Sequence, residues 1–302
     1  MTYCLGIKVN DGLVLASDSR TNAGVDYVNT YSKMFRFELG PQRIFVIVTS
    51  GNLATSQEVI QRLQHDLSNP AATTNLNTVP TLFEAAKYLG QTSQMVQEEH
   101  ATALQRSGIN GESYFILGGE ISGQPHGIFL VYAQGNCISP SDENPFLQIG
   151  ETKYGKPILD RVISPLTSLE DASRAALVSI DSTIRSNITV GPPVEISIVK
   201  QGCFQVNQYL KLEEQDIFYK SMTQRWNEGL RDSFNTLPRF PWESRTQPQE
   251  QQQRVELVPQ PSPGPTSGAP QIQELSQQNC NQQQSGFSPS PTQPSGSPPS
   301  GS

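Results

Sequence analysis

Residues 2–20, TYCLGIKVNDGLVLASDSR, contain the pattern that decides the fold. Two runs with alternating apolar residues, 2–9 and 13–20, flank the turn signal Asn-Asp-Gly. Alternating runs on either side of such a turn predict a β-hairpin. Because the free ends of a hairpin lie side by side, we expect Thr2 and Asp18 to be neighbours.

Two registers are possible for this hairpin. A two-residue turn that ends at Gly12 would place Leu5 opposite Asp18 and mix polar with apolar side chains on one face. A three-residue loop with Gly12 in the left-handed bulge position would pair Cys4 with Asp18, and it would leave one face apolar. A slip of one residue moves every side chain to the other face, so we expect the second register, which separates the two kinds of side chain. Asp18 then lies diagonally across from Thr2.

The rest of the first 240 residues alternates between blocks of strands and blocks of helices. Period-two and continuous apolar runs predict strands at 35–39, 44–48, 114–118, 127–132, 195–199 and 204–209, with short segments near Cys137 and Phe146. Apolar residues three and four apart predict helices at 53–69, 81–105, 153–163, 168–185 and 218–234. This order predicts an α+β domain with helices layered on antiparallel sheets.

Composition divides the chain into two parts. From about Trp242 the sequence is almost entirely Pro, Gln, Ser and Gly. Such a segment cannot bury enough apolar surface to offset the entropy of ordering it. We therefore expect 1–240 to be the folded domain and 241–302 to be a disordered tail.

The same composition argues against several classes of protein. The 302 residues carry a net charge of −7 without a block of Lys or Arg, which disfavours nucleic-acid binding. No apolar run reaches the roughly 18 to 20 residues of a membrane span, and the first residues lack the pattern of a signal peptide. The Cys residues are widely separated and the His residues have no ligand spacing, so we expect a cytoplasmic protein that uses no metal or other cofactor.

Thr2 follows Met1 directly, and methionine aminopeptidases expose a small residue at this position. A free N-terminal Thr would hold both a nucleophilic hydroxyl and its own base, because an α-amine has a pKa of about 7.7 to 8.0. A nearby cation would lower this pKa. Lys33 is the candidate, since alternation places it on the strand face of Phe35, and Asp18 could pair with it. Taken singly, Thr2 fits a frayed terminus, Asp18 a surface ion pair at a strand end, and Lys33 a lysine at a strand end whose ammonium reaches solvent. Taken together, the three residues predict a catalytic site.

These residues resemble the proteasome-type N-terminal-nucleophile hydrolases, and among them the bacterial Anbu (ancestral β-subunit) family. The resemblance covers about 2–240 and rests on short motifs: Thr2, ASDSR at 16–20, Lys33, TSGN at 49–52, GETKYGKP at 150–157 and STIRSN at 182–187.

The resemblance implies a four-layer αββα sandwich with Thr2 at one end of the central sheets. It also implies that the Thr2 hydroxyl attacks an amide carbonyl and forms an ester-linked acyl-enzyme, with Lys33 lowering the local pKa values and Asp18 orienting Lys33. The backbone N–H of Gly51 would stabilise the oxyanion, although a glycine also suits a corner between a strand and a helix. The predicted walls of the substrate pocket include Thr49 and Asn22.

The chain departs from the family pattern at two places, and two functions therefore stay open. It has Gly-Glu-Thr at 150–152 where the family usually has Gly-Ser-Gly, and Arg-Ser-Asn at 185–187 where an Arg-Asp pair and a Ser-Gly are usual. One hypothesis is a Thr-dependent hydrolase of peptides or small amides inside a self-compartmentalising homo-oligomer. The other is a catalytically weak or silent assembly or peptide-binding subunit. No unfoldase partner can be named, and the apolar stripe of the last helix either docks a neighbour or closes the chain's own core: Met222, Trp226, Leu230 and Phe234.

Overall fold

The computed structural model describes residues 1–22 and 28–243. Its strands are β1 (Tyr3–Val9), β2 (Gly12–Asp18), β3 (Arg20–Asn22), β4 (Val28–Thr30), β5 (Met34–Glu38), β6 (Arg43–Gly51), β7 (Ser113–Ile121), β8 (Gly127–Val131), β9 (Cys137–Ile138), β10 (Phe146–Gly150), β11 (Val194–Lys200) and β12 (Gln208–Leu212). Its helices are α1 (Leu53–Ser68), α2 (Leu82–Arg106), α3 (Lys156–Val162), α4 (Leu169–Ser186) and α5 (Ile217–Asn235), with a short 3₁₀ helix at Gly40–Gln42. Met1–Pro238 form one compact unit. The tail expected at 241–302 lies outside the described residues, apart from its first three.

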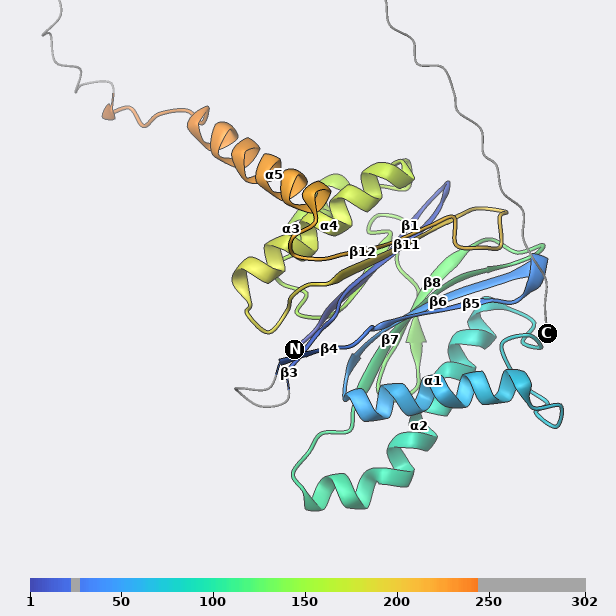
Figure 1. Ribbon diagram of the computed structural model, residues 1–302. Helices are drawn as coiled ribbons and strands as arrows, with labels where there is room; N and C mark the ends of the chain where they lie inside the picture. Colours follow the sequence, from blue (N-terminus) through green and yellow to red (C-terminus); the bar gives the residue numbers. More distant parts are fainter. Residues whose placement is uncertain (23–27, 244–302) are drawn as a thin grey trace, which may run out of the picture. The chain divides into compact units, whose positions relative to one another are not determined.

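Two antiparallel sheets form the centre of this unit (Figure 1). The first sheet has the strand order β10-β1-β2-β11-β12 and the second β5-β6-β7-β8-β9, while β3 and β4 pair separately. Helices α3, α4 and the start of α5 pack on the first sheet, and α1 and α2 pack on the second. The predicted αββα sandwich of antiparallel sheets and helices is therefore confirmed.

Three apolar clusters hold the four layers together. One lies between the first sheet and its helices and includes Leu5 and Ile180; another lies between the second sheet and its helices and includes Phe45 and Leu89. The third fills the space between the sheets and includes Val46. Because β6 is covered on both faces, its sequence is a continuous apolar run instead of an alternating one.

The N-terminal hairpin has neither of the registers expected from the sequence. Its strands pair Cys4 with Ser17, Ile7 with Val14 and Val9 with Gly12, so that the loop consists of residues 10 and 11. The expected register requires one face of the hairpin to be more polar than the other. Every residue of β2 is buried, because one face packs against helices and the other against the second sheet, and segregation of the faces therefore selects no register.

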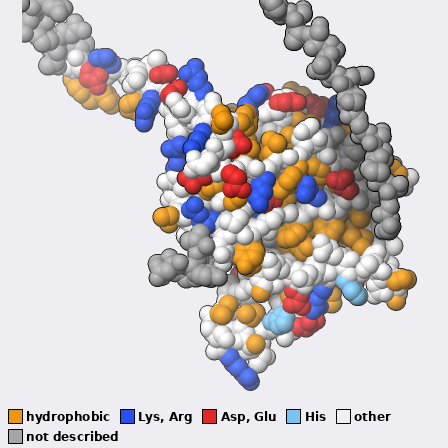
Figure 2. Space-filling view, in the orientation of Figure 1, with side chains coloured by type: hydrophobic (Ala, Val, Ile, Leu, Met, Phe, Trp, Pro, Cys, Tyr) orange, Lys and Arg blue, Asp and Glu red, His pale blue; other side chains and the backbone are white. Residues whose placement is uncertain are grey.

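The last helix closes the core only with its first two turns. Tyr219 is buried and Met222 packs against the cluster between α4 and the first sheet, whereas Leu230 and Phe234 are exposed. Figure 2 shows side chains of both charge signs mixed over the face in view, without a large patch of one sign. Within the described part of the chain, no helix has the length and apolar character that crossing a membrane requires.

Candidate active site

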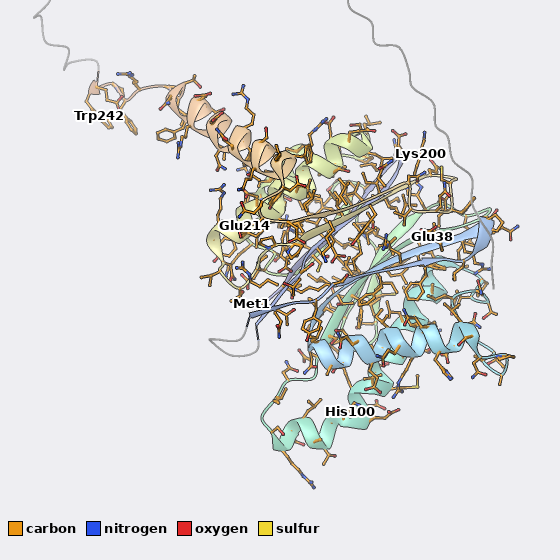
Figure 3. All side chains as sticks on the ribbon, viewed as in Figure 1. Met1, Glu38, His100, Lys200, Glu214 and Trp242 are labelled. Atoms are coloured by element: carbon orange, nitrogen blue, oxygen red, sulfur yellow. The ribbon has the colours of Figure 1, made fainter. Side chains whose placement is uncertain are left out.

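A cavity of about 520 Å³ lies where the N-terminus meets the ends of the two sheets. Figure 3 shows Met1 at this end of the sandwich, beside the start of the first strand. Five lining residues carry or flank the predicted chemistry: Met1, Thr2, Lys33, Thr49 and Gly51. The cavity is of a size that suits a few residues of a peptide or a small organic ligand.

A buried ion pair stands behind this cavity. Lys33 Nζ donates to Asp18 Oδ1 at 2.7 Å and to the carbonyl of Arg20 at 2.6 Å. The Asp18 carboxylate also accepts the backbone N–H groups of Tyr3 at 3.1 Å and of Gly191 at 3.1 Å. Asp18 is fully buried and Lys33 nearly so. These contacts hold the ammonium group of Lys33 in one position at the wall of the cavity.

The direction of the Lys33 side chain differs from the one that strand alternation predicts. Alternation predicts that Lys33 shares a face with Phe35 and Phe37, and those two rings pack toward α1 and α2. Lys33 instead precedes β5, and its side chain reaches the end of β2 in the other sheet. Lys33 therefore lies at the cavity as predicted, but strand alternation does not account for the direction of its side chain.

The ionisable groups at this end perturb one another. Burial raises the pKa of Asp18, and the ammonium of Lys33 and the two backbone N–H groups oppose that rise. Burial also lowers the pKa of the terminal amine of Met1. Lys33 lowers that pKa further, whereas Asp18 and Glu151 raise it.

Thr2 is fixed by its main chain. Its carbonyl accepts the N–H of Glu151 at 2.8 Å, and β1 pairs with β10 from Tyr3 onward. Gly150 has a φ of +84°, and a Cβ there would stand 1.9 Å from the Thr2 carbonyl oxygen, so only glycine permits this close approach. With Met1 present, the nitrogen of Thr2 is part of a peptide bond, and removal of Met1 converts it into a terminal amine at the cavity.

The corner between β6 and α1 forms another part of the cavity wall. Gly51 has a φ of +103°, and a Cβ on it would lie 2.3 Å from the carbonyl oxygen of Glu112, so the corner itself requires a glycine. Asn52 caps α1 by accepting the N–H of Thr55. Thr49 is buried, and its N–H donates to the carbonyl of Lys33 at 3.0 Å.

One predicted pocket residue cannot be placed as a side chain. Asn22 ends β3 and pairs with Val28, and its side chain lies outside what the structure describes. Of the two departures from the family pattern, only the first is at the cavity, which Glu151 lines. Arg185 instead forms a 2.8 Å ion pair with Asp181 along α4.

Sequence reasoning missed Glu195, which supports both members of the ion pair. This buried carboxylate accepts the hydroxyls of Ser19 at 3.0 Å and Ser32 at 2.8 Å, the residues next to Asp18 and Lys33, and that of Tyr209 at 3.1 Å. The available signal was a glutamate between Val194 and Ile196 in the predominantly apolar strand VEISIVK. Sequence reasoning also missed several cavity-lining residues: Tyr114, Tyr132 and Gln148. Across residues 1–22 and 28–243, no group of three or more His, Cys, Asp or Glu residues could hold a metal ion.

The family model described as proteasome subunit matches residues 2–199, which is more than half of the chain. The chain belongs to the proteasome subunit family. A curated proteasome subunit beta of Haloquadratum walsbyi is 23% identical over 218 residues, which cover 70% of this chain and 79% of that protein.

Two solved Anbu structures resemble this proteasome-family chain more strongly. Anbu from Yersinia bercovieri is 39% identical, with a TM-score of 0.74 over 79% of this chain and 98% of the other. The helical assembly of the Anbu complex from Pseudomonas aeruginosa is 40% identical, with the same TM-score and the same coverage. The resemblance inferred from the N-terminal motifs, to proteasome-type N-terminal-nucleophile hydrolases of the Anbu kind, is confirmed.

Proposed function

We propose that this chain is a threonine-type peptidase or amide hydrolase that uses the hydroxyl of Thr2 after Met1 has been removed. The observation that carries the proposal is the buried pair of Lys33 and Asp18 beside the cavity that Thr2 lines. Buried ion pairs contribute little to the stability of a fold, whereas perturbed charges in a cavity are typical of catalytic sites. Membership of the proteasome subunit family supports the same class of reaction.

The proposed reaction has two halves. In the first, the neutral α-amine of Thr2 accepts the hydroxyl proton while Oγ attacks the carbonyl carbon of an amide. The C–N bond breaks, the leaving amine takes that proton, and the acyl group remains on Oγ as an ester. In the second half, water transfers a proton to the α-amine as it attacks the ester. The bond from the acyl carbon to Oγ breaks, the α-amine returns the proton to Oγ, and the carboxylic acid leaves.

The neighbouring residues have separate roles in this proposal. Lys33 favours the neutral form of the α-amine by placing a positive charge beside it, and Asp18 orients Lys33. The N–H of Gly51 would donate to the oxyanion that forms during the attack, a contact typically worth a few kcal/mol. Thr49 and Asn22 are proposed to contact the substrate.

We also propose that the chain works as a homo-oligomer in the cytoplasm on a peptide or a small amide. A relative from Pseudomonas aeruginosa was solved as a helical assembly. The exposed Leu230 and Phe234 on α5 of this chain are apolar side chains of the kind that subunit interfaces bury.

A silent or weak assembly subunit is the second candidate, and one observation favours it. Glu151 lines the cavity and raises the pKa of the terminal amine of Met1. The same charge beside the amine of Thr2 would act against the neutral form that catalysis needs. The two candidates differ in whether Thr2 is required for any activity.

The test compares wild-type protein with Thr2→Ala and Thr2→Ser on fluorogenic peptide amides. All three proteins have a small residue after Met1, so Met1 can be removed from each of them. We expect kcat/KM to fall by about a thousandfold or more in Thr2→Ala, as for the loss of a nucleophile, and to be partly retained in Thr2→Ser. Hydrolysis that persists in Thr2→Ala would contradict the proposal, and normal function in cells that carry Thr2→Ala would favour the silent subunit.

A further inference from the structure

The carboxylate of Glu151 has an unusual position next to the N-terminus. Its backbone N–H is bonded to the carbonyl of Thr2 at 2.8 Å, which places it beside the residue that would become the mature terminus. The side chain is only 11% exposed, and its Oε2 atom is buried without a hydrogen-bond partner. The cation of Lys153 is 3.6 Å away, beyond hydrogen-bonding distance, on a side chain that is 68% exposed and therefore screened by water.

A buried acceptor without a donor is a destabilising feature, and folded proteins rarely leave one. In the chain that carries Met1, the nitrogen of Thr2 is an amide with a single N–H. Removal of Met1 turns this nitrogen into an amino group with two or three N–H donors, on the residue that Glu151 already contacts through its main chain. The donor that Oε2 lacks would therefore be created by the removal of Met1.

We propose that Glu151 is a positioning residue whose carboxylate accepts a hydrogen bond from the α-amino group of Thr2 in the processed chain. The inference rests on one part of the proposed function, that Thr2 becomes the N-terminal residue, and it does not require that the chain hydrolyses anything. Its consequence is that the α-amine is held between two opposite charges.

Several ionisable groups lie around this position, and three of them bear on the pKa of the terminal amine of Met1. Lys33 and burial lower the pKa of the terminal amine of Met1, while Asp18 and Glu151 raise it. Lys153 lies on the solvent side of the Glu151 carboxylate. Tyr114 and Tyr132 also line the cavity, and the pKa of Tyr114 is raised by burial and by Glu112. Tyr3 and Cys4, which follow Thr2 in β1, are buried, and burial raises the pKa of both.

The sign of the effect follows from the charge. A carboxylate favours the protonated amine, so Glu151→Gln lowers the pKa of the α-amine, by about one pH unit for a partly buried pair at close range. Glu151→Asp keeps the charge and retains most of the effect. Lys153→Gln is the matched control, since it removes a cation from the same carboxylate and leaves the α-amine pKa unchanged or slightly higher.

The experiment measures the pKa of the Thr2 α-amine directly, without using catalysis. Each full-length variant is made as a ubiquitin fusion that is cleaved before Thr2, and intact mass verifies the free terminus. The rate of acetylation of the α-amine by dilute acetic anhydride is then followed against pH by mass spectrometry of the N-terminal peptide. Thermal unfolding shows that each variant is folded, and Glu151→Thr, which also removes the charge, supplies a second test if Glu151→Gln is not.

We expect the wild-type pKa to lie about one pH unit above that of Glu151→Gln, with Glu151→Asp and Lys153→Gln close to wild type. Equal pKa values in wild type and Glu151→Gln would overturn the inference. The inference would also be overturned if Glu151→Gln left the α-amine pKa unchanged and selectively lost cleavage of substrates with Lys or Arg side chains. In that case the carboxylate would bind a cation of the substrate. A wild-type protein that shows the expected pKa but hydrolyses no amide would contradict the proposed function and leave the inference intact.

Discussion

Asp18 at the end of β2 and Glu195 on the neighbouring β11 are both buried carboxylates, but they are held by different partners. Asp18 pairs with the ammonium of Lys33 at the wall of the cavity. Glu195 accepts three hydroxyl groups, and no ion pair to it occurs within the described part of the chain. The ion pair of Asp18 and Lys33 places charged groups at the wall of the cavity. The hydroxyl groups that bond to Glu195 are neutral, and they only tie together the chain segments that carry them. The first arrangement is expected for chemistry and the second for the scaffold that supports it.

Removal of the cation should have the largest effect. In Lys33→Met the carboxylate of Asp18 is left buried without its countercharge, so we expect the free energy of unfolding to fall by about 3 to 5 kcal/mol. We also expect kcat/KM to fall by about a thousandfold or more, because the positive charge beside the α-amine is lost. Urea denaturation and peptide-amide kinetics measure the two effects.

The double variant Lys33→Met with Asp18→Asn separates these effects. Replacement of both charges removes the uncompensated carboxylate, so most of the stability should return while the activity stays lost. Recovery of activity in the double variant would mean that the ion pair serves only to hold the fold.

Loss of the Glu195 charge should have an intermediate effect. Glu195→Gln keeps the shape of the side chain but weakens three hydrogen bonds to a charged acceptor, so we expect a loss of about 2 to 4 kcal/mol in the free energy of unfolding. The fall in kcat/KM should stay below about tenfold, because no charge beside the α-amine is removed. Tyr209→Phe, which removes one of the three donors, is the matched control with a smaller loss of stability. A fall in activity as large as that of Lys33→Met would contradict the distinction between the two carboxylates.

The smallest expected effect is the change of wild-type kcat/KM with pH. Burial and Lys33 lower the pKa of the terminal amine of Met1. We expect the same two causes to act on the amine of Thr2 once Met1 is removed, and a lowered pKa means that the neutral form exists at lower pH. We therefore expect kcat/KM to rise with pH along a limb whose midpoint lies below the usual α-amine value of about 8. A midpoint above that value would show that the two carboxylates, Asp18 and Glu151, dominate the field at the amine.

Sequence patterns predicted most of the helices and strands, because each of these elements depends on residues that are close together in the sequence. The N-cap Ser168, for example, accepts the N–H of Asp171 and begins α4 where the pattern places it. The paired strands β3 and β4 were not predicted. Strand β12 begins at Gln208 instead of residue 204, because the chain first turns through Phe204, whose φ is +50°. The hairpin register was wrong for a non-local reason, since which faces of β2 are covered depends on layers formed by distant residues.

The candidate site was predictable only as far as its residues lie near the N-terminus or within motifs. Thr2, Asp18 and Lys33 were identified from the first 33 residues, and the structure brings Lys33 and Asp18 into contact. Glu195 was not identified, because its partners Ser19 and Ser32 are more than 160 residues away along the chain. Such a network depends on the pairing of β11 with β2, which no local pattern specifies.

The central claim is that Thr2 carries both a free amine and a reactive hydroxyl. The most direct test is the intact mass of the purified protein before and after treatment with a peptide epoxyketone, which reacts with the hydroxyl and the amine of one N-terminal residue together. We predict a chain that lacks Met1 and gains one adduct, located on Thr2 by fragmentation, and no adduct on Thr2→Ala. A chain that lacks Met1 but gains no adduct would contradict the claim.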